Sequence, residues 1–206
     1  MTRTTSRTAI LFAGVLLLLG YAVSGMGMTG HMTGHMVAVA VAAPLLAFGL
    51  IGSPLDPARR WPRAVTPMAM MMLELVAVWS WHLPALRRAA DTLPLLAAAE
   101  HLTFLAAGLL LWSAAIHAPN RAAGIGALLL TSMHMTLLGV LIGLAPRPLY
   151  ASGLAGHHHT APFGLDVLAD QQLGGVVMLV IGGLSYLLGG LALLAGLLKA
   201  EPETAP

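Results

Sequence analysis

The sequence predicts an all-α integral membrane bundle of about six transmembrane helices, and two observations carry that prediction. The first is composition: 58% of the 206 residues are hydrophobic and 9% are charged, whereas soluble domains carry roughly 25% charged residues. The second is a set of apolar stretches, each near the ~20 residues that a helix needs to cross a bilayer core. Six such stretches lie at about 8–27, 30–52, 65–83, 93–116, 122–145 and 171–198.

The first stretch has the outline of a signal peptide. Arg3 and Arg7 precede an apolar run from Ala9 to Gly20, and small residues follow. No A-x-A cleavage site comes next, and the following residues continue at helical spacing. We therefore expect an uncleaved signal anchor that forms the first helix.

Polar breaks separate the later stretches, with prolines in each of them: 53–63, 84–94, 119–121 and 146–170. The fourth break is a long loop rich in Gly, His and Pro, and Asp166 and Asp170 are expected to cap the last helix behind it. Residues 200–206 form a polar tail that we expect to be disordered. The whole chain, 1–206, is then a single transmembrane domain.

Lys and Arg in the short loops predict that both termini are cytoplasmic. That orientation places seven basic residues inside and three outside. Those inside are Arg3, Arg7, Arg59, Arg60, Arg63, Arg121 and Lys199, and those outside are Arg87, Arg88 and Arg147. Seven of the nine histidines then fall in the outer half or in the outer loops, where they gather near one face of the membrane.

Several function classes are excluded. The formal charge of +2 comes from scattered residues that make no nucleic-acid surface. The chain has no cysteine, so a metal must be held by other side chains or by backbone oxygens. Its 23 glycines lie in apolar stretches, where small residues such as Gly189 and Gly190 allow close helix packing rather than phosphate binding. No nucleophile and base pair stands out at the outer face, so we predict that the chain is not an enzyme.

The most informative segment is 25–36, at the start of the second stretch. His31 and His35 are four residues apart and would project from one face of a helix, as a metal-binding pair does. Met28, Met32 and Met36 recur at the same spacing, and thioether sulfur joined with imidazole favours Cu(I). The alternative is that the methionines are apolar gap-fillers and the histidines lie at the headgroup level.

Two more histidines are candidates at the outer ends of the third and fourth stretches. His82 follows Trp79 and Trp81, so it is either a member of the interfacial belt or a ligand. His101 lies about two turns inside an apolar helix, where ionisable groups face the bundle interior and are functional candidates.

Glu74 and His134 are the most deeply placed polar groups, and we expect them to meet in the core. They would form a hydrogen-bonded pair, orient an imidazole or pass protons. The triple histidine His157, His158 and His159 in the long loop is a secondary, weak metal site.

Several segments together resemble the CtaG-type cytochrome c oxidase assembly proteins, a multi-pass membrane family linked to oxidases of the caa type. Their order and spacing match over roughly residues 30–185. The segments are His31-Met32 and His35-Met36 ahead of Ala43-Pro44-Leu45-Leu46, Trp81-His82-Leu83-Pro84-Ala85-Leu86, Glu100-His101-Leu102-Thr103-Phe104, Ala145-Pro146-Arg147-Pro148-Leu149-Tyr150 and Asp170-Gln171-Gln172-Leu173-Gly174-Gly175. This chain has six predicted helices, where members of the family have about seven.

The resemblance implies assembly of a heme-copper oxidase in a bacterial cell membrane, through copper handled at the outer or periplasmic face. It adds Asp170 as a site candidate. We then expect His31, His35 and His101 to be the principal copper ligands, with Met32 or Met28 completing the set and His82 and Asp170 as neighbours. The expected partners are an oxidase subunit, a soluble copper donor and the lipid bilayer, with no nucleic acid.

Two rival functions stay open at this point. Transmembrane histidines on different helices also act as axial heme ligands, which would make the chain a heme-binding or electron-transfer protein. A proton-coupled transporter would instead use Glu74 and His134 as a buried relay.

Overall fold

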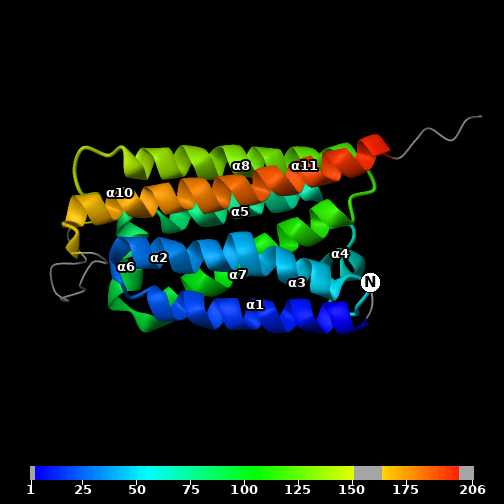
Figure 1. The fold of residues 1–206 in the computed structure, drawn as a ribbon, viewed down its shortest axis with the longest axis horizontal. Coiled ribbons are helices and arrows are strands. Elements are labelled where there is room, and N and C mark those ends of the chain that lie inside the picture. The colour runs from blue at the N-terminus through cyan, green and yellow to red at the C-terminus, as the bar shows by residue number, and fades with distance from the viewer. Residues whose placement is uncertain (1–2, 151–163, 200–206) are drawn as a thin grey trace, which may run out of the picture.

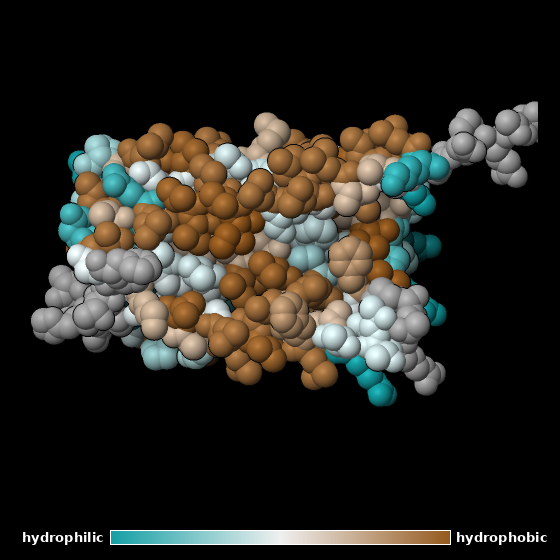
Figure 2. Space-filling view, in the orientation of Figure 1, coloured by the Kyte–Doolittle hydropathy of each residue, from teal (hydrophilic) through white to brown (hydrophobic). Residues whose placement is uncertain are grey.

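The computed structural model describes residues 3–150 and 164–199, and within these residues the chain forms helices and short connections without strands. The long helices lie side by side along the long axis of a bundle (Figure 1). Apolar side chains cover the middle of the face seen in Figure 2, and hydrophilic ones gather at its two ends. This is the surface expected of a bundle that spans a bilayer.

The predicted stretches are all helical. In chain order the elements are α1 (Arg3–Val23), α2 (Gly27–Met36), the π-helical η1 (Val37–Ala42), α3 (Ala43–Leu50), α4 (Pro57–Arg60), α5 (Pro67–Trp81), α6 (Pro84–Thr92), α7 (Pro94–Ile116), α8 (Arg121–Gly143), α10 (Val167–Val177), the π-helical η3 (Met178–Gly182) and α11 (Gly183–Lys199). In the described residues, five helices are long and apolar enough to cross a membrane, or six if the bent pair α5 and α6 counts as one span.

The third span is shorter than the sequence indicates. Helix α5 has 15 residues, about 22 Å at 1.5 Å per residue, against the ~30 Å of a bilayer core. Leu83 is extended because it precedes Pro84, and the chain turns by 71° before α6 begins at that proline. Helix α6 therefore lies across one end of the bundle instead of continuing α5.

Helix α1 begins and α11 ends at the same end of the bundle, opposite α6 (Figure 1). An even number of crossings gives this arrangement. Both termini on one side agree with the predicted topology, and the assignment of that side to the cytoplasm stays a prediction from the loop charges.

Glycines bring the helices close together, as the small residues in the apolar stretches indicate. A Cβ on Gly175 of α10 would lie 2.5 Å from the backbone nitrogen of Gly143 in α8, and one on Gly189 would lie 2.2 Å from the ring of Trp112. Only a residue without a side chain fits at such contacts.

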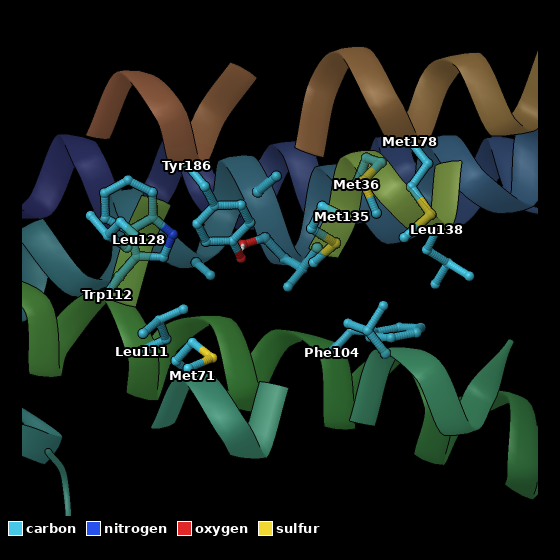
Figure 3. Packing of buried hydrophobic residues seen from close by; sticks show 14 of the residues in the cluster. Met36, Met71, Phe104, Leu111, Trp112, Leu128, Met135, Leu138, Met178 and Tyr186 are labelled. Carbon is cyan, nitrogen blue, oxygen red and sulfur yellow. Dashed lines mark hydrogen bonds between the residues drawn. The ribbon is translucent and has the colours of Figure 1, made fainter. Parts of the chain in front are cut away.

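The buried core is rich in methionine and aromatic rings (Figure 3). Met36, Met135 and Met178 come from three different spans and pack in its interior, and Trp112 stacks on Tyr186 with ring centroids 5.6 Å apart. Phe104 extends this core along α7 to the histidines at the end of the bundle where α6 lies, and its ring centroid is 4.4 Å from that of His35. The core thus fixes the helices that carry the site described next.

Candidate metal centre

His31 and His35 project from one face of α2, as their spacing of four residues predicts. Their ring centroids are 3.9 Å apart, and both side chains are buried. Neither nitrogen of His35 has a hydrogen-bond partner in the described part of the chain. A buried imidazole with both nitrogens unpaired is costly unless something else binds it.

His101 of α7 and His82 at the end of α5 join this pair. The ring centroid of His101 lies 4.8 Å from that of His35 and 6.3 Å from that of His31, and the ring of His82 lies 6.4 Å from His35. Four imidazoles from three helical segments therefore converge at one end of the bundle.

The backbone fixes the tautomers of His82 and His101. Each Nδ1 donates a hydrogen bond to the carbonyl four residues earlier, at 2.6 Å for Val78 and 2.9 Å for Ala97. The lone pair of each ring is then on Nε2, and both Nε2 atoms are buried without a partner among residues 3–150 and 164–199. Imidazoles that bind metals are held in the same way, with the distal N–H bonded to a carbonyl.

Glu100 supplies a carboxylate at the centre of these rings. Its Oε1 lies 3.4 Å from Nε2 of His31 and 3.7 Å from Nε2 of His35. Ligand atoms of these three buried residues lie within 4.8 Å of one another, a spacing that suits a single metal ion.

Arg87 of α6 completes the polar cluster. Its Nη1 donates to Nε2 of His31 at 2.6 Å and to Oε2 of Glu100 at 2.8 Å, and its Nη2 donates to Asp91. A guanidinium has no acceptor atom, so His31 must present a lone pair to it. The bend before α6 is what brings this arginine over the ends of α2 and α7.

A cavity of about 440 Å³ opens beside the cluster, and Tyr21 of α1 forms part of its wall. His31, Arg87, Glu100 and His101 line it, so a ligand in the cavity would contact these groups. Tyr150 also lines the cavity and donates to the backbone carbonyl of His82 at 3.0 Å. Burial raises the pKa of Tyr150 to about 12, which keeps the hydroxyl proton available for that bond.

The methionines predicted to share the site lie on the neighbouring row of α2. A Cβ on Gly174 of α10 would lie 3.1 Å from Cγ of Met32 and 3.2 Å from Cγ of Met28, so both side chains pack against the last span. Met28 also lines the cavity. Adjacent residues on a helix point about 100° apart, which is why the methionine and histidine rows face different neighbours.

Asp170 acts as a helix cap in the structure. Its Oδ2 accepts from the backbone nitrogen of Met28 at 2.6 Å, and its Oδ1 accepts from that of Thr29 at 3.0 Å. The aspartate thus caps α2 instead of its own helix, which begins at Val167 and is capped by Asp166 through the nitrogen of Ala169. Its position anchors the first turn of the helix that carries His31 and His35.

Glu74 and His134 do not pair. Glu74 accepts from the hydroxyl of Tyr186, and the carbonyl oxygen of Val39, 3.1 Å from the same hydroxyl, is a second acceptor for its single proton. Both ring nitrogens of His134 are buried and lack a hydrogen-bond partner in the described residues. His157, His158 and His159 lie outside the described residues.

A family model, cytochrome c oxidase caa3 assembly factor (Caa3_CtaG), matches residues 2–200. The chain belongs to this family. No curated protein and no solved structure shows a significant match. This family membership confirms the resemblance that the sequence motifs indicate.

Sequence reasoning missed Arg87 and Glu100 as members of the cluster. Arg87 was counted only as a loop charge, and Glu100 only as the neighbour of His101. The available signal was the pairing of Arg87 with Asp91 four residues later on a short helix opened by a proline, a pattern that presents both charges on one face. Contact with His31, 56 positions earlier, carries no local signal.

Proposed function

We propose that this caa3 oxidase assembly factor binds copper at its outer membrane face and passes it to a subunit of the oxidase. The observation that carries the proposal is the convergence of His31, His35 and Glu100, with His101 beside them, at the wall of a cavity. Imidazole is a ligand that suits copper, and the family assembles an oxidase of the heme-copper class.

The arrangement of the donors supports binding and transfer rather than turnover. Nε2 of His101 is held as a lone pair with no partner, and both nitrogens of His35 are unpaired within the described segments. Such donors gain a partner when an ion arrives. The cavity leaves one side of the cluster open, so an acceptor ligand can reach the ion and exchange with His31 or His101. A soluble donor would load the ion by the reverse exchange.

Metal analysis by mass spectrometry, with an absorption spectrum, tests this proposal on detergent-purified protein made without a polyhistidine tag and with copper supplied. The expected result is about one copper per chain without heme absorption, and loss of that copper in His31→Ala/His35→Ala. The matched control is the triple alanine variant of His157, His158 and His159, which should keep it. An unchanged copper content in the double variant would exclude this site, and a Soret band without copper would favour the heme-binding rival.

Transfer of copper to the oxidase is tested separately, in cells. In cells whose chromosomal copy is replaced by the His31→Ala/His35→Ala variant, we expect loss of caa3-type oxidase activity that added copper restores in part. Normal oxidase copper content in these cells would show that the cluster does not supply the metal.

A further inference from the structure

Arg87 is the feature of the cluster that metal ligation alone does not explain. Its guanidinium is buried and lies 2.6 Å from the lone pair of His31 and 2.8 Å from Glu100. A guanidinium keeps its positive charge at any physiological pH. A permanent cation therefore stands beside the atoms expected to receive another cation.

The charges around the cavity determine what this arrangement favours. Arg87, Asp91 and Glu100 are the charged residues among those that line it. With the imidazoles neutral, which is the form that ligates metals, one positive and two negative charges leave one net negative charge. A monovalent ion would cancel that charge. A divalent ion would leave a net positive charge in a buried site, where desolvation makes uncompensated charge costly.

We propose that Arg87 makes this site selective for monovalent ions, so that Cu(I) rather than a divalent metal is the ion handled. The inference rests on the proposed copper function; it gives a charge-based reason for the Cu(I) expected from the sequence and names the residue that selects it. Cγ of Met28 and Cγ of Met32 pack against Gly174 of α10, and Met28 also lines the cavity. The charge balance favours a monovalent ion without any thioether ligand.

Arg87 cannot leave the neighbourhood when an ion arrives. The lone pair of His31 either accepts the guanidinium hydrogen or binds the ion, so that one hydrogen bond breaks on loading. The ion pairs with Asp91 of α6 and Glu100 of α7 remain. The positive charge thus stays within a few ångströms of the bound ion, at a separation where one charge changes affinity strongly.

The test compares affinities for Ag(I), a redox-inert analogue of Cu(I), and Zn(II) in the full-length protein in detergent. Arg87→Gln should raise the affinity for Zn(II) relative to Ag(I) by about tenfold to 100-fold. Arg88→Gln, which removes the adjacent exposed arginine of the same helix, should leave the ratio unchanged. Equal changes for both ions in Arg87→Gln would overturn the inference.

Charge rescue separates selectivity from a merely structural role. Arg87→Gln/Asp91→Asn restores one net negative charge and should return the ratio to that of the unaltered protein. Asp91→Asn alone should lower Zn(II) affinity relative to Ag(I), and this variant keeps the test decisive if Arg87→Gln does not fold. A double variant that behaves like Arg87→Gln would contradict the charge argument. If the unaltered protein bound neither Ag(I) nor Zn(II), both the proposed copper function and the selectivity of Arg87 would be wrong. If it bound Ag(I) and no variant changed the ratio of Zn(II) to Ag(I) affinity, only the selectivity of Arg87 would be wrong.

Discussion

The two ends of the bundle each bury a carboxylate against a histidine, yet they differ in how the polar atoms are satisfied. At the end that holds the chain termini, Oδ2 of Asp56 lies 3.1 Å from Nε2 of His117, and Oδ1 accepts from the hydroxyl of Ser113 at 2.7 Å. His117 Nδ1 donates to the carbonyl of Ser113 at 3.0 Å, and that serine hydroxyl also accepts from the nitrogen of Ala58 at 3.2 Å. Nδ1 of His117 is thus hydrogen-bonded, and its Nε2 faces a carboxylate oxygen.

At the opposite end, several buried imidazole nitrogens lack a hydrogen-bond partner among the described residues. His35 has two unpaired nitrogens, and His82 and His101 have one each in the residues that the structure describes. A buried polar atom without a partner costs about 1–3 kcal/mol, and a bound ion removes that cost for each imidazole lone pair that it binds. The difference teaches that a His–carboxylate contact is not enough to suggest a metal site, whereas unpaired imidazole nitrogens beside a cavity make one a candidate.

The largest effect should come from removing one surplus donor. We expect His35→Ala to lower copper affinity by about 100-fold or more, because it deletes the most buried imidazole of the cluster. His117→Ala, the matched change at the other end, should leave the affinity unchanged. Competition with a chelator of known affinity measures the copper affinity of each variant. Equal losses in the two variants would contradict the assignment of copper binding to one end of the bundle.

The cap of α2 should have the next largest effect, on stability. Asp170→Ala removes a buried carboxylate that accepts two backbone N–H groups and should lower the free energy of unfolding by about 2–3 kcal/mol. Asp166→Ala, which removes the exposed cap of α10, should cost about 0.5–1 kcal/mol. Thermal unfolding in detergent gives the comparison. Similar losses for the two variants would show that α2 does not depend on the last span for its first turn.

The network of Asp56, Ser113 and His117 at the other end should respond in stability only. Ser113→Ala leaves one oxygen of Asp56 and the nitrogen of Ala58 without a partner, so a loss of about 1–2 kcal/mol is expected. Copper content should stay at the level of the unaltered protein. A lower copper content in a Ser113→Ala variant that still folds would show that the hydrogen-bond network at one end affects copper binding at the other, which contradicts the prediction.

Tyr150→Phe should have the smallest effect. It removes one hydrogen bond to the carbonyl of His82, worth about 1 kcal/mol, and keeps the ring that lines the cavity. We expect a small fall in the midpoint of thermal unfolding and less than about fivefold loss of copper affinity. A loss as large as that of His35→Ala would make Tyr150 part of the binding site.

Much of the fold could be predicted because membrane spans depend on local composition. Apolar runs and prolines located every span within a few residues, and the spacing of His31 and His35 predicted their shared face. The bend after α5, the π-helical segments and the glycine contact between Gly143 and Gly175 depend on packing between helices. Hydropathy carries no information on such contacts.

The candidate site was predictable only as far as single helices determine it. The histidines stand out because polar groups are rare in apolar helices. Met28 and Met32 were predicted as ligands from their thioether sulfur and their spacing of four residues, and the structure packs Cγ of both against Gly174 of α10. Asp170, suggested by resemblance, caps α2, and Arg87 enters the cluster only through the bend of α6. Partners far apart in the chain decide these roles.

X-ray absorption spectroscopy of the copper-loaded protein tests the central claim most directly, because it identifies the atoms bound to the metal. We predict a shell of nitrogen and oxygen ligands with the outer scattering of at least two imidazoles, and loss of one imidazole in a His35→Ala variant that retains some copper. A sulfur shell in place of the imidazoles, or a spectrum unchanged by His35→Ala, would contradict the account.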